Sequence, residues 1–93
     1  MEEDLRIFSR KNTLFHALIM APNTNIIADW RQRVKKSLPD LQEQIEIYSF
    51  AYMMRNYQKY AQKKYNYIVV DDERVIIRTK LEKPSKIKGL ALI

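Results

Sequence analysis

The sequence predicts a small α+β domain in which helices precede a β-hairpin. Residues 25–38 and 40–64 contain no glycine and no proline, and their apolar residues recur at helical spacing or cover almost all sides. After residue 65 the pattern changes to alternation, which is typical of strands. With 93 residues there is enough apolar material for one core, so we expect a single domain over residues 1–93.

The first helix is expected at about residues 13–20, where Phe15, Leu18 and Ile19 follow helical spacing. Pro22 ends it, because the residue before a proline is biased away from helical backbone angles. We interpret His16 as a part-buried residue of this helix. Residues 1–12 stay open, since the acidic start suits a helix N-terminus but a polar insert at residues 9–13 interrupts the pattern.

The second helix, at about residues 25–38, carries an apolar stripe that includes Trp30. Pro39 stops this helix, and Asp40 can cap a third helix over about residues 40–64. The centre of this third helix, residues 45–54, is apolar on nearly every side. It therefore needs cover, either from the other elements or from a second copy or another protein.

A β-hairpin is expected from strands at about residues 65–70 and 75–81. The acidic residues between them, Asp71, Asp72 and Glu73, are interpreted as turn residues rather than as Mg²⁺ ligands. Beyond Pro84 the chain ends in apolar residues. This segment either returns as a third strand or docks on a partner, and the sequence leaves both readings open.

The composition limits the function. Lysine and arginine number 17 against 11 aspartate and glutamate, and the resulting net charge of +6 favours polyanionic partners. Without cysteine, and with one histidine and one glycine, the chain cannot form a thiolate metal site, a cysteine nucleophile or a glycine-rich phosphate loop. We expect no enzyme activity, cofactor, metal or small-molecule substrate. Neither a signal peptide nor a membrane span is indicated, so we expect a cytoplasmic protein without membrane contact.

The strongest binding signal is a basic row with tyrosines interleaved, at the end of the third predicted helix. Two further basic surfaces lie on the second helix and on the return strand of the hairpin. The first hypothesis is a non-enzymatic DNA- or RNA-binding protein, such as a small regulator or accessory factor. The candidate contact residues are Arg55, Lys59, Lys63, Lys64, Arg78, Lys80, Arg31, Arg33 and Lys35.

The order of three helices and a basic hairpin is similar to a winged-helix layout, whose third helix enters the major groove. Another small α+β arrangement is the other possibility. The alternative function is a protein-binding module (an inhibitor, adaptor, assembly subunit or homo-oligomer) that uses the apolar helix centre and tail. Its candidate contact residues are Tyr52, Met53, Met54, Leu90, Leu92 and Ile93. Tyr48 and Tyr52 are interpreted as core residues with their hydroxyls at the rim.

Overall fold

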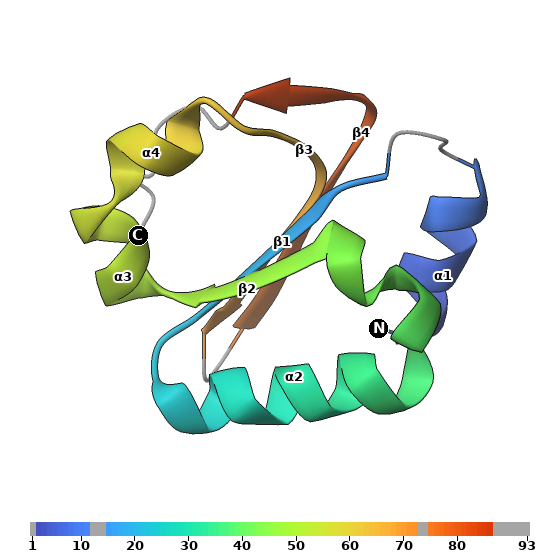
Figure 1. Cartoon of the computed structure of the whole chain (residues 1–93), viewed down its shortest axis with the longest axis horizontal. Helices are drawn as coiled ribbons and strands as arrows, with labels where there is room; N and C mark the ends of the chain where they lie inside the picture. The colour runs from blue at the N-terminus through green and yellow to red at the C-terminus, as the bar shows by residue number, and fades with distance from the viewer. Residues whose placement is uncertain (1, 12–14, 73–74, 87–93) are drawn as a thin grey trace.

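The computed structural model describes residues 2–11, 15–72 and 75–86 (Figure 1). These residues form a mixed α+β fold, as predicted, with a four-stranded sheet of order β2-β1-β3-β4. The elements follow in the order α1 (Glu2–Lys11), β1 (Ala17–Ala21), α2 (Thr24–Ser37), the 3-10 helix η1 (Pro39–Gln44), β2 (Ile45–Ser49), α3 (Phe50–Arg55), α4 (Tyr57–Ala61), β3 (Lys64–Asp72) and β4 (Val75–Lys86).

The sheet is built around β1, which pairs in parallel with β2 on one side and with β3 on the other. Ile19 of β1 lies opposite Ile47 of β2 and Val69 of β3. β4 returns antiparallel to β3, with an irregularity in register between Tyr65 and Tyr67. Each of the two parallel connections carries helical structure, as parallel strands require.

The prediction of a helix at residues 13–20 is wrong, because residues 17–21 form the strand β1. All five residues of Ala17–Ala21 are buried. A parallel strand covered on both faces appears in the sequence as a continuous apolar run, and a run this short cannot be told from a buried helix by spacing alone.

The prediction of one helix at residues 40–64 is also wrong. Asp40 belongs to the short helix η1, residues 45–49 form β2, and the helical remainder is broken at Asn56 into α3 and α4. The apparent all-round apolarity has a simple cause: Ile45 and Ile47 face one side of the sheet, and the apolar residues of α3 pack on the other. The alternation Ile-Glu-Ile in residues 45–47 is the period-two signal of a strand.

Two other elements confirm the predictions: α2 at residues 24–37 and the hairpin of β3 and β4. α1 answers the open question about the N-terminal segment by forming a helix over Glu2–Lys11. The winged-helix layout is not confirmed, since three of the four strands, β2, β1 and β3, run parallel. The apolar tail lies outside the described residues. In the described chain no helix is long and apolar enough to cross a membrane.

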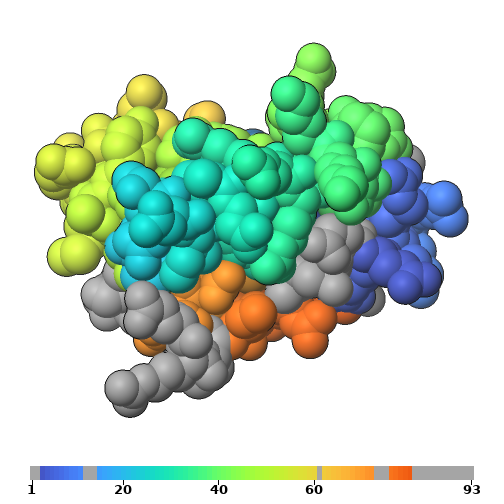
Figure 2. Space-filling model, turned by 90° about the horizontal axis from the view of Figure 1, so that it is seen from below, coloured from blue at the N-terminus to red at the C-terminus, as the bar shows by residue number. Residues whose placement is uncertain are grey.

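The core has two layers, one on each face of the sheet. On one face, α1 and α2 bury Leu5, Trp30 and Val34 against inward-facing strand residues such as Ile19. On the other face, α3 and α4 bury Met53 and other residues against the strands. Figure 1 shows α2 on one side of the strands and α3 and α4 on the other, and in Figure 2 α2 runs across the surface between α1 and α3.

Local contacts define where α2 begins and ends. The Asn23 side chain accepts a hydrogen bond from the backbone N–H of Ile26 at 3.0 Å, which caps the helix N-terminus. At the other end the N–H of Leu38 donates to the carbonyl of Val34 at 2.7 Å, and Pro39 begins η1. The predicted second helix therefore ends where the proline requires it to end.

Trp30 joins α2 to the far end of β3. Its ring is buried, and its Nε1–H donates to the carboxylate of Asp71 at 2.7 Å. A buried indole N–H without an acceptor carries a desolvation cost, so this bond matters for stability. The interpretation of Asp71 and Asp72 as turn residues is wrong, because both belong to β3 and pair with β4. Asp71 is instead the acceptor for the largest core side chain.

We expect Asp71→Ala to lower the free energy of unfolding by about 1–3 kcal/mol, because it leaves the Trp30 N–H buried without a partner. Asp71→Asn keeps a carbonyl oxygen that can accept the bond, so its effect should be clearly smaller. Urea unfolding followed by tryptophan fluorescence measures both values. Equal losses in the two variants would show that the negative charge, and not the acceptor, is what stabilises the fold.

Candidate nucleic-acid interface

The candidate site lies at the junction of α3 and α4, the part of the chain where the sequence gives its strongest binding signal. Ser49 ends β2 and caps α3, since its hydroxyl accepts a hydrogen bond from the N–H of Tyr52 at 3.0 Å. Asn56 then ends α3 and begins α4. Its side-chain amide donates to the carbonyl of Tyr52 at 2.8 Å, so one residue both closes one helix and opens the next.

The break at Asn56 bends the chain around a surface hollow of about 530 Å³, which we call the α3–α4 hollow. Arg55 and Lys59 line it, both are exposed, and neither forms an ion pair within the described residues. No carboxylate of the described chain lines the hollow. Its lining residues are Met54, Arg55, Asn56, Tyr57, Gln58 and Lys59. The hollow therefore combines two positive charges, two amides and one aromatic ring.

A group of tyrosines packs in the core layer that α3 and α4 form with the sheet. Tyr60 is buried, and its hydroxyl lies 2.6 Å from that of Tyr52. The rings of Tyr48 and Tyr52 stack at 5.0 Å. Lys59 lies over the Tyr60 ring at 5.5 Å, which orients its ammonium group. As predicted, Tyr48 and Tyr52 pack against the core.

The part-buried carboxylate of Glu46 forms an ion pair with Lys63, which is one of the predicted contact residues. Its side chain is 13% exposed, and it accepts hydrogen bonds from Lys63 at 3.0 Å, Tyr48 at 2.8 Å and Tyr65 at 3.0 Å. Sequence reasoning missed this residue. The signal was present, because a glutamate between Ile45 and Ile47 in a strand must face the side opposite to both isoleucines.

His16 contacts the same carboxylate, from the segment that leads into β1. Its Nε2 lies 2.5 Å from Glu46, and its Nδ1 lies 2.9 Å from the carbonyl oxygen of Lys64. Both partners are acceptors, so the ring makes both bonds only when both nitrogens carry a proton. The interpretation of His16 as a helix residue is wrong, although it is part-buried as predicted.

The remaining predicted contacts divide into free and paired cations. Arg78 and Lys80 on β4 both pair with Asp4, and Arg33 pairs with Asp29. Three cations form no ion pair within the described chain: Arg31, Lys35 and Lys64. Arg55, Lys59 and Lys63 were expected to form one row on a straight helix. The break at Asn56 separates them, and only Arg55 and Lys59 meet in the hollow.

The predicted partner contacts also separate. Met53 is fully buried in the core of this chain and cannot contact a partner, whereas Met54 is 62% exposed beside Arg55. Tyr52 is half-buried in the tyrosine group. Leu90, Leu92 and Ile93 lie outside the described residues. Successive residues of a helix point in directions about 100° apart, so Met53 can face the core while Met54 faces solvent.

No protein family, curated protein or solved structure matches the chain. Within the described residues, no group of three or more histidine, cysteine, aspartate or glutamate side chains could hold a metal ion.

The ionisation of Glu46 gives the fold a testable pH dependence. Burial raises the pKa of Glu46, but hydrogen bonds from Tyr48, Lys63 and Tyr65 outweigh burial, so the pKa lies below its ordinary value of 4.5. Burial and the nearby carboxylate raise the pKa of Tyr65 above its ordinary 10.0, so this hydroxyl stays protonated and donates. A carboxylate with a lowered pKa stabilises the fold above the unfolded value and loses this effect as the pH falls through the folded value.

We expect Glu46→Gln to be less stable than the wild type by about 1–3 kcal/mol at about pH 6. The difference should shrink as the pH falls to about 3, because the wild-type carboxylate becomes protonated. Denaturant unfolding across this range measures it. The control is Asp29→Asn, which removes an exposed ion pair and should cost less than about 1 kcal/mol. A Glu46→Gln difference that does not change with pH would contradict an ionised Glu46.

Proposed function

We propose that this protein is a non-enzymatic nucleic-acid-binding protein that holds a single-stranded segment in the α3–α4 hollow. The observation that carries the proposal is the lining of the hollow, where Arg55 and Lys59 lie without any described carboxylate to neutralise them. Unpaired cations at a surface gain most from a phosphate, because phosphate contact releases the counterions of the nucleic acid.

The roles of the lining residues follow from their chemistry. Arg55 and Lys59 contact phosphates. Tyr57 offers a ring on which an unpaired base can stack, and Asn56 and Gln58 offer amides to a base edge or sugar. The site suits an unpaired strand better than a duplex, because two short helices separated by a break do not supply a helix long enough to lie in a major groove.

The proposal uses fewer contact residues than the sequence predicts. Lys63, Arg78, Lys80 and Arg33 each have a carboxylate partner in this chain, and giving it up would offset part of what a phosphate contributes. In this proposal they stabilise the fold and do not contact the nucleic acid. Lys64 is exposed and lies shortly after α4, where it can extend the phosphate path beyond the hollow.

We expect Arg55→Gln/Lys59→Gln to weaken binding to fluorescein-labelled oligo-dT and oligo-U. The slope of log affinity against log salt should fall by about 1.4, since each phosphate contact to a single strand contributes about 0.7. Fluorescence anisotropy across a salt series measures both quantities. The matched control is Lys11→Gln/Lys36→Gln, which removes the same charge from exposed lysines outside the hollow.

The same assay tests the aromatic contact. Tyr57→Phe keeps the ring and should bind almost normally, whereas Tyr57→Leu should lose several-fold or more in affinity because stacking on a base is lost. If the wild-type protein does not bind either oligonucleotide at low salt, the proposed function is wrong. An equal loss in the lysine control would show that net charge alone, and not the hollow, attracts the strand.

A further inference from the structure

The outer edge of β2 is a second binding feature, separate from the α3–α4 hollow. Within the described chain β2 pairs only with β1. Alternate residues of a parallel strand direct their N–H and C=O groups to opposite sides, so part of Ile45–Ser49 presents both groups away from β1. Unpaired backbone groups at a sheet edge are a template for another extended chain.

A groove follows this edge, and we call it the β2 edge groove. It consists of two adjoining hollows of about 410 Å³ each, which share Arg31, Ile47 and Tyr48. One reaches Gln42 before the strand, and the other reaches Tyr52 after it. The groove therefore extends along the whole strand, which is the length of edge that an added strand needs.

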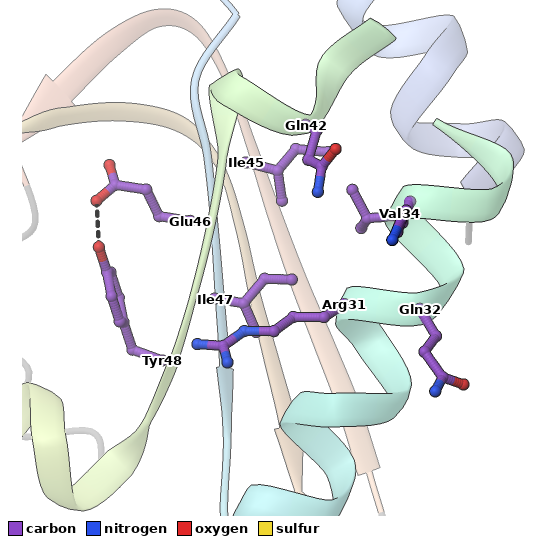
Figure 3. Close-up of a pocket in the computed structure, with 9 residues that line it drawn as sticks. Arg31, Gln32, Val34, Gln42, Ile45, Glu46, Ile47 and Tyr48 are labelled. Atoms are coloured by element: carbon purple, nitrogen blue, oxygen red, sulfur yellow. Dashed lines mark hydrogen bonds between the residues drawn. The ribbon is translucent and has the colours of Figure 1, made fainter. Parts of the chain in front are cut away.

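The two walls of the groove differ in character. Figure 3 shows Arg31 of α2 on the same side of β2 as Ile47, and Glu46 and Tyr48 on the opposite side. An added strand would place alternate side chains on these two sides. One set would face the basic wall of α2, and the other would face the aromatic wall that Tyr48 forms.

The charge of the groove is positive. Arg31 and Lys35 line it, are exposed, and form no ion pair within the described residues. The one lining carboxylate, Glu46, faces the opposite side of the strand, where Lys63 lies at 3.0 Å and His16 at 2.5 Å. It therefore does not neutralise the basic wall.

The spacing of these charges matches a strand. Arg31 and Lys35 are one helical turn apart, a rise of about 6 Å along α2. Alternate residues of a strand are about 6.6 Å apart. We propose that the β2 edge groove binds an extended peptide of another protein that has acidic residues at alternate positions and apolar residues between them. The peptide adds to the sheet beside β2, and its carboxylates lie against Arg31 and Lys35.

Two other occupants fit less well. A second copy paired through β2 would bring Arg31 and Lys35 of both copies to one interface, where like charges repel. Basic side chains beside an edge strand oppose such self-pairing. A nucleic acid could neutralise the basic wall, but it has no repeating amide and carbonyl groups to pair with the strand edge. An acidic peptide satisfies both the charges and the backbone groups.

The test uses the full chain and a fluorescein-labelled heptapeptide of alternating glutamate and valine. We expect Arg31→Glu/Lys35→Glu to weaken binding by at least about tenfold, because attraction is replaced by repulsion. Lys11→Glu/Lys36→Glu, with the same change of net charge outside the groove, should stay within about twofold. Circular dichroism checks that both variants are folded. In nuclear magnetic resonance spectra, the amide signals of residues 45–49 should shift on binding.

A second set of experiments changes the peptide and leaves the protein unchanged. Methylation of alternate backbone nitrogens removes the donors of the added strand and should abolish binding. Equal binding by an alternating lysine–valine peptide, or retained binding by Arg31→Glu/Lys35→Glu, would overturn the proposal. A wild-type dimer in light scattering would also overturn the proposal if its formation shifts the amide signals of residues 45–49. Displacement of the peptide by oligo-dT, with shifts of the same amide signals, would overturn it as well. Failure of oligo-dT to bind at all bears only on the α3–α4 hollow.

Discussion

The carboxylate of Glu46 is the interaction on which the arrangement of this domain depends. It lies near the start of β2 and contacts residues from all three parallel strands: His16 just before β1, Tyr65 near the start of β3, and Tyr48 two residues further along β2. Lys63 adds a fourth contact from the end of the α4 segment. A part-buried carboxylate lowers stability unless it is paired and hydrogen-bonded, so the contacts of Glu46 hold these elements together at one place.

This constraint decides which cations are left for a partner. Lys63 forms an ion pair with Glu46, and Arg78 and Lys80 form ion pairs with Asp4. Hydrogen bonds from Lys80 and Tyr67 lower the pKa of Asp4. Of the predicted contact residues, those that stay exposed and form no ion pair in the described chain are Arg55 and Lys59 in the α3–α4 hollow, Arg31 and Lys35 on α2, and Lys64 after α4. The number of basic residues in the sequence therefore overstates the positive charge that a partner can contact, because ion pairs within the chain neutralise some of these residues.

How much the sequence could predict depends on how local each signal is. α2 and the hairpin were predictable, because Asn23, Pro39 and the alternation around the acidic turn act through their immediate neighbours. β1 and β2 were not, since a short apolar run becomes a strand only when other strands lie beside it. For the candidate site, Arg55 and Lys59 were predicted from the basic row in the sequence. The break at Asn56 that unites them, and the capture of Lys63 by Glu46, depend on tertiary contacts.

The two edge strands of the sheet differ in how they are protected against pairing with another chain. Within the described chain β4 forms one edge of the sheet, and its sequence contains several lysines and a proline, which has no N–H to donate. These are the usual means by which an edge is closed to other chains. β2 forms the other edge and contains neither proline, lysine nor arginine. Its protection comes from Arg31 and Lys35 on the neighbouring helix. Charges beside a sheet edge repel chains of like sign and attract chains of opposite sign. The basic residues beside β2 therefore favour the addition of an acidic strand, whereas the lysines and the proline of β4 disfavour the addition of any strand.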